Sequence, residues 1–211
     1  IETALVCDVM TSPKVRRQGL FTKLGNYSLN DLIKNNLNFT LGYPTDRHVM
    51  LAHAKAGWKN HFNLPLYIKF IKFNSFLKKF NLNFLSLFIN IPYSILNKIY
   101  ELLIFRDVLK VDKLTTNEFI SHKGLEKFVN QFNKSHLITL DKSKNFFKWR
   151  LSIPNKKYNI HLVHNNNNIL GCAITLKTLR SNIPVLEIVD IIAVENIYKT
   201  IKSLIFDIKK Y

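Results

Sequence analysis

The sequence predicts a mixed α+β protein in which sheets are flanked by helices, with two incomplete halves joined by a helical connector. Segments typical of a strand, a helix, a second strand and a second helix follow one another in residues 1–65. Residues 66–112 are rich in phenylalanine and lysine and are predicted to be helical. Residues 113–211 hold alternating segments on both sides of an asparagine-rich turn, which predicts a β-hairpin. We therefore expect two domains, 1–65 and 113–211, around the connector.

The composition is that of a folded, basic protein. The 211 residues are 47% hydrophobic and 12% aromatic, which is enough to bury a core and excludes a disordered chain. Lysine and arginine total 31 against 14 acidic residues, and the net charge of +17 favours anionic partners such as coenzyme phosphates, nucleic acid or a membrane surface. The basic residues are scattered along the chain, which favours a generally basic surface over a dedicated polyanion track. We expect no specific nucleic-acid partner.

The first domain opens with a short apolar segment, ALVCDVM at 4–10, which predicts a buried strand interrupted by Asp8. Apolar residues then recur at helical spacing over 20–33, and a second strand is predicted at 39–43. This order of elements predicts a parallel pair of strands.

A second helix is predicted after Pro44. Thr45 or Asp46 can serve as its N-cap, and Gly57 lies where a left-handed helix end favours glycine.

The two cysteines, Cys7 and Cys172, each lie in an apolar segment predicted to be a strand. Buried thiols of this kind are typical of a reducing compartment, so we expect a cytoplasmic protein, with a disulfide between the two as the alternative. The chain begins at Ile1, inside what is predicted to be a core strand, with no basic-then-apolar leader before it. We expect a fragment that lacks an upstream part.

The connector contains an uncharged stretch between Asn81 and Asn97. It is shorter than the roughly 20 apolar residues that a membrane span needs, and Pro92 interrupts it. We expect a helical connector packed on the domains. The alternative is an amphipathic segment, 70–105, that makes a peripheral contact with a membrane surface.

The second domain is predicted to begin with a helix whose capping box pairs Thr115 with Glu118. A short helix ending near Trp149 precedes the hairpin, and a further strand and an amphipathic helix complete the chain. The predicted strands are 158–164, 169–178 and 186–194.

The passage DVMTSPKVRRQGLFTKL carries the clearest chemical signal, because a strand runs through a turn into the start of a helix. Backbone amides at a helix start have no intrahelical partner, and together with the helix dipole they suit a pyrophosphate. Gly19 allows close approach to the backbone, while Arg16 and Arg17 add charge. An ordinary basic helix start is the alternative.

This passage resembles the acyl-coenzyme A binding motif of the GNAT superfamily of N-acyltransferases. Arg16 and Gly19 match the motif, whereas Arg17 stands where many members have glycine and Phe21 stands at the last small-residue position. The later passage GYPTDRHVMLAHAKAGWKN resembles the next motif of that family, through its glycine and tryptophan near the end.

The resemblance implies a GNAT-like fold in both halves. It also implies transfer of an acyl group from acetyl-CoA or another acyl-CoA to a small-molecule or peptide amine, in a reaction that uses no metal. The first domain would then be the C-terminal part of an acyl-CoA binding domain. Residues implied in coenzyme binding are Val9, Met10 and Thr11 through their backbone, and Arg16, Arg17, Gln18, Gly19, Leu20 and Phe21.

Direct attack of an amine on a thioester needs a base for the amine proton and an acid for the leaving thiolate. Asp8 is the candidate base, because a carboxylate within an apolar strand needs a partner or a shifted pKa; a structural pairing is its alternative. By the resemblance, His53 stands where the family often has a tyrosine acid, with a surface histidine as the alternative. Asp46 and His48 are further candidates to line the cleft.

The segment IVDIIAV at 188–194 is similar to VCDVM, since both place an aspartate within an apolar strand before a helix. No glycine or arginine follows it, so the second domain lacks a phosphate-binding turn and resembles the coenzyme-free half of tandem acyltransferases. Arg150 could contact an anionic acceptor or form a structural salt bridge.

Two other functions remain open from the sequence. One is a non-catalytic GNAT-like scaffold attached to a membrane surface. The other is an aminoacyl transferase of the peptidoglycan-crossbridge kind, whose basic charge would hold tRNA. The dispersed histidines and cysteines predict no metal site.

Overall fold

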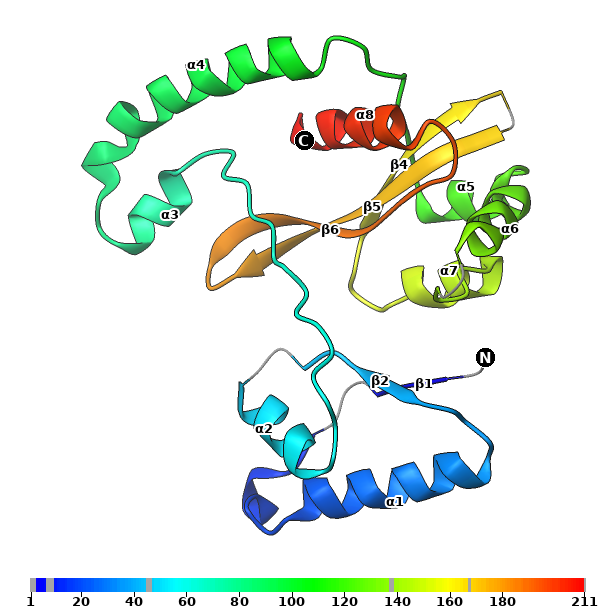
Figure 1. Ribbon diagram of the computed structural model, residues 1–211. Helices are drawn as coiled ribbons and strands as arrows, with labels where there is room; N and C mark the ends of the chain where they lie inside the picture. Colours follow the sequence, from blue (N-terminus) through cyan, green and yellow to red (C-terminus); the bar gives the residue numbers. More distant parts are fainter. Residues whose placement is uncertain (1–2, 7–9, 45–46, 137–138, 167, 211) are drawn as a thin grey trace. The chain divides into compact units, whose positions relative to one another are not determined.

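The computed structural model describes residues 3–6, 10–44, 47–136, 139–166 and 168–210. The chain divides into two compact units, Ile1–Ile68 and Lys69–Tyr211 (Figure 1). Helices and strands occur in both, so the predicted mixed α+β class is confirmed. Residues 69–112 group with the second unit, whereas the sequence predicts them to be a separate connector.

The first unit consists of two parallel strands and two helices in the predicted order. Strand β1 (Ala4–Val6) pairs with β2 (Thr40–Gly42), with Ala4 opposite Thr40. A 3-10 turn, η1 (Pro13–Val15), leads to helix α1 (Leu20–Lys34), and α2 (Arg47–Lys55) follows β2. Both candidate N-caps of α2 lie outside the described residues, as does Cys7.

Strand β1 is not the buried strand that its apolar sequence predicts. Leu5 is 48% exposed, because the described sheet of this unit has only two strands and one side of β1 faces solvent. Burial in this unit is concentrated instead at the end of α2. His53 and Ala56 are buried there, beside Trp58, and Gly57 takes the predicted left-handed conformation with φ +85°.

The second unit is built on an antiparallel sheet of order β3-β4-β5-β6. The predicted hairpin is confirmed: β4 and β5 are paired, with Ile160 opposite Ile174. The strand bounds are β3 Asp112–Leu114, β4 Tyr158–Asn165, β5 Asn168–Arg180 and β6 Ile183–Ala193.

Helices cover both faces of this sheet. Ile160 and Leu162 point to the face covered by α5 (Thr116–Ser121), α6 (Leu125–Ser135) and α7 (Lys144–Leu151). Val163 and Ala173 point to the opposite face and pack against α8 (Ile197–Lys209). The predicted capping box is confirmed, since Thr115 caps α5 and Glu118 bonds back to the Thr115 amide at 2.7 Å.

A buried polar cluster joins α8 to the sheet. The fully buried His161 lies 2.7 Å from Asp207 through Nδ1 and 3.1 Å from the Thr175 hydroxyl through Nε2. Cys172, on the other face of β5, is a buried free cysteine.

Between Lys69 and β3 the chain forms α3 (Asn74–Lys79), the 3-10 turn η2 (Asn83–Leu85) and the long helix α4 (Ser86–Ile104). The predicted helical character of this stretch is confirmed, and Pro92 lies within α4. Among the described residues, no helix combines the length and apolarity needed to cross a membrane.

Candidate functional site

The turn before α1 is shaped by two residues in the left-handed region. Arg17 has φ +66° and Gly19 has φ +71°. A left-handed residue other than glycine costs roughly 1–2 kcal/mol, so Arg17 holds a conformation that glycine would adopt at lower cost. Apart from Gly19 and its two chain neighbours, no atom of the described residues lies within 4 Å of the place that a Cβ on Gly19 would occupy, so the backbone there is open to an incoming group.

The start of α1 carries no side-chain cap. The first helical hydrogen bond runs from the Lys23 amide to the Gly19 carbonyl at 3.0 Å. The amides of residues 20–22 precede it, and no bond from them to a described acceptor is found; Gly19, as the N-cap, has no side chain to offer. These amides and the positive end of the helix dipole form an anion-binding arrangement.

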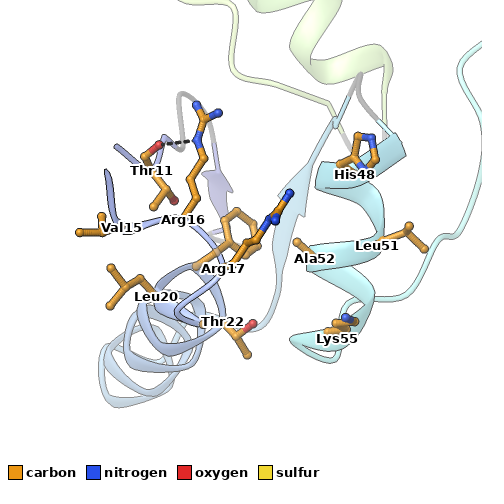
Figure 2. Close-up of a pocket in the computed structure, with 12 residues that line it drawn as sticks. Thr11, Val15, Arg16, Arg17, Leu20, Thr22, His48, Leu51, Ala52 and Lys55 are labelled. Carbon is orange, nitrogen blue, oxygen red and sulfur yellow. Dashed lines mark hydrogen bonds between the residues drawn. The ribbon is translucent and has the colours of Figure 1, made fainter. Parts of the chain in front are cut away.

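A cavity of about 440 Å³ lies between this turn and α2 (Figure 2). Its volume is within the roughly 300–1,000 Å³ range of small-molecule sites. Its ionisable lining side chains are Arg16, Arg17, His48 and Lys55, and its described lining holds no carboxylate. The other lining residues are Thr11, Val15, Gly19, Leu20, Phe21, Thr22, Leu51 and Ala52. The cavity is therefore suited to an anionic ligand.

The two arginines of the turn have different surroundings. Arg16 donates from Nε to the Thr11 carbonyl at 3.1 Å, which holds its guanidinium against the preceding segment. Arg17 extends toward the space between α1 and α2 (Figure 2). Gln18 and Met10 are exposed and do not line the cavity. Val9 lies outside the described residues.

The structure places the candidate acid His53 in the core of the first unit, so its alternative as a surface histidine is wrong. It is buried between the rings of Phe21 and Trp58, each with its centroid at 5.0 Å. Its Nδ1 lies 2.8 Å from the Val49 carbonyl, and because a carbonyl only accepts, Nδ1 carries the proton.

His53 does not line the large cavity. It borders a second cavity of about 80 Å³, together with Val6, Thr40 and Trp58. Phe21 borders both cavities and separates the histidine from the basic turn.

The remaining candidates have different outcomes. Asp8 and Asp46 lie outside the described residues, so their roles stay predictions. In the second unit, Asp190 forms an ion pair with Lys142, with Nζ and Oδ1 2.6 Å apart, and so has a structural partner. Arg150 is half-buried and has no ion-pair partner among the described residues.

Of the α2 residues that line the cavity, sequence reasoning named His48 and missed Leu51, Ala52 and Lys55. His48, Leu51, Ala52 and Lys55 all line it, and their spacing of three, four and seven residues places them on one face of a helix. This spacing was the available signal, but position 55 could be recognised as a site residue only after the cavity was located.

The fold and the site together define a mixed α+β protein with a basic cavity at an uncapped helix start. Comparison with protein families, characterised proteins and solved structures finds no match for this chain. Among the described residues, no group of His, Cys, Asp and Glu side chains is arranged to hold a metal ion.

Proposed function

We propose that the protein is a GNAT-like N-acyltransferase that binds acetyl-CoA or another acyl-CoA in the cavity between α1 and α2. The observation that carries this proposal is the uncapped turn at Gly19, which lines a cavity whose described ionisable side chains are all basic. The diphosphate of the coenzyme would accept hydrogen bonds from the amides of residues 20–22. Arg17 would contribute charge from the side that faces α2.

In the proposed reaction, the nitrogen of a neutral amine attacks the thioester carbonyl carbon. A C–N bond forms, the C–S bond breaks and the thiolate leaves with the coenzyme, while the amine proton passes to a base. Asp8 is the candidate base in this proposal and, by the resemblance, His53 is the candidate acid for the leaving thiolate.

Isothermal titration of the full chain with acetyl-CoA tests the binding step. Gly19→Ala is expected to weaken binding about tenfold or more, because its Cβ would project into the open approach to the turn, and Gly19→Pro to abolish it. Gly57→Ala is the matched control. Gly57 also has a positive φ and open space at its Cβ position, but it does not line the cavity.

Equal losses of binding in Gly19→Ala and Gly57→Ala would show that backbone strain, and not the turn, controls the affinity. No binding of coenzyme A by the wild-type chain would end the proposal. A shift of charged tRNA in a native gel, without coenzyme binding, would favour the aminoacyl-transferase alternative.

The proposed location is the cytoplasm, with a small-molecule or peptide amine as the acceptor. The burial of Cys172 is compatible with this location, because buried thiols are typical of proteins of a reducing compartment.

A further inference from the structure

Helix α4 presents its polar side to its own unit and its apolar side to solvent. On the inner side, Asn90 accepts a hydrogen bond from the Phe73 amide at 2.9 Å, and the Tyr93 hydroxyl donates to the Phe70 carbonyl. Near the end of the helix, Glu101 forms an ion pair with Lys209 at 2.8 Å. These contacts fix the rotation of α4 about its axis.

The opposite side, which we call the apolar face of α4, is exposed. Its residues are Leu87, Phe88, Ile91, Ile95, Leu96, Ile99, Leu102 and Leu103. Phe88 is 78% exposed and Leu102 is 68% exposed. A surface helix of a globular protein normally buries its apolar stripe, so this orientation is the reverse of the usual one. A contiguous apolar surface of this kind marks an interaction site.

The charges around α4 indicate what covers the apolar face. The basic residues of 69–106 are Lys69, Lys72, Lys78, Lys79, Lys98 and Arg106, and the acidic residue is Glu101. Glu101 is paired inward with Lys209, whereas Lys78, Lys79 and Lys98 are exposed. The exposed charge beside the apolar face is therefore positive.

This charge argues against a second copy of the chain as the occupant. The whole chain carries +17, and two such chains repel one another when they associate. An anionic bilayer accepts both features, because its acyl boundary takes up apolar side chains and its headgroups attract lysines.

We propose that α4 lies in the headgroup–acyl boundary of an anionic membrane, with its apolar face inserted and the lysines of α3 and α4 at the lipid headgroups. Asn90, Tyr93 and Glu101 hold the rest of the second unit above the surface. This membrane contact goes beyond acyl transfer and does not depend on it. The two proposals can fail separately, because vesicle binding and coenzyme binding are measured in separate experiments.

Sedimentation of the full chain with vesicles tests the membrane contact. Vesicles of phosphatidylcholine with phosphatidylserine are compared with phosphatidylcholine alone, at low and high salt. The wild-type chain is expected to bind the anionic vesicles at least about tenfold more tightly, and salt is expected to reduce this difference.

Paired variants separate the apolar and the electrostatic parts. Phe88→Gln with Ile95→Gln is expected to weaken binding about tenfold or more, while Leu179→Gln with Tyr198→Gln, at equally exposed apolar positions outside α4, leaves it unchanged. Lys78→Gln with Lys79→Gln is expected to weaken binding to anionic vesicles only. The exposed pair Lys156 and Lys157, changed in the same way, is its charge-matched control.

Equal vesicle binding by the wild-type chain and the Phe88/Ile95 variant would overturn the proposal. A vesicle-free dimer, detected by light scattering and lost in that variant, would assign the face to a second copy instead. Absence of vesicle binding by the wild-type chain would also overturn the proposal. If the Phe88/Ile95 variant then had a lower melting temperature, the chain itself would cover the apolar face of α4.

Discussion

Arg17 has two roles that a single substitution separates. Its left-handed backbone, φ +66°, costs roughly 1–2 kcal/mol, which Arg17→Gly removes. The greater freedom of glycine in the unfolded chain offsets about 0.5–1 kcal/mol of that gain. At the middle of both ranges, the net effect is a first unit that is more stable by about 0.75 kcal/mol.

The same change removes a guanidinium from the cavity lining. A hydrogen bond to a charged group contributes about 1.5–3 kcal/mol, so the dissociation constant for acetyl-CoA is expected to rise about tenfold or more. Stability and affinity therefore move in opposite directions.

Urea unfolding followed by Trp58 fluorescence, in a Trp149→Phe background, reports on the first unit, and titration calorimetry reports the affinity. Lys14→Gln is the control, because it removes an exposed charge from η1 outside the cavity lining and should leave both quantities unchanged. An unchanged affinity in Arg17→Gly would refute the placement of the diphosphate. An unchanged or lower stability would refute the strain argument.

Three further predictions concern the second unit. Asp207→Ala leaves the Nδ1 of buried His161 without its carboxylate and should lower the free energy of unfolding by about 1–3 kcal/mol, measured by urea denaturation; no change would show that the pair is structurally neutral. In a Cys7→Ser variant, thiol reagents should modify Cys172 only on unfolding, because burial raises the pKa of its thiol; rapid labelling of the native protein would contradict this. Burial lowers the pKa of His122 in the folded state. As the pH falls below about 6.5, the unfolded state therefore binds more protons than the folded state, and the free energy of unfolding decreases. His122→Asn should flatten that slope in denaturation measured from pH 7 to pH 5, and an unchanged slope would exclude His122 as its source.

Local patterns allowed much of the fold to be predicted. The helical spacing in α1, the Thr115–Glu118 capping box and the alternation in β4 and β5 are signals contained within single elements, and all three predictions are confirmed. The burial of β1 was predicted wrongly because burial depends on how many strands and layers lie beside a strand. The sequence of β1 alone does not contain that information.

The site was predictable only in part, for a similar reason. The turn at Arg17 and Gly19 is encoded locally, and both residues take the left-handed conformation. The position of His53 behind Phe21 depends on how α1 and α2 pack, and the pairing of His161 with Asp207 joins residues 46 apart in the chain. No periodicity in the sequence encodes such contacts.

The uncapped start of α1 also has a consequence for motion. A helix whose first turn lacks a side-chain acceptor opens and closes there more readily than in its middle. An anion bound at Gly19 would complete that turn, so occupancy of the cavity and order of the helix end should rise together. Deuterium uptake at the amides of residues 20–22 would then fall when acetyl-CoA is added, whereas uptake near Lys34, at the far end of the same helix, would stay as it was.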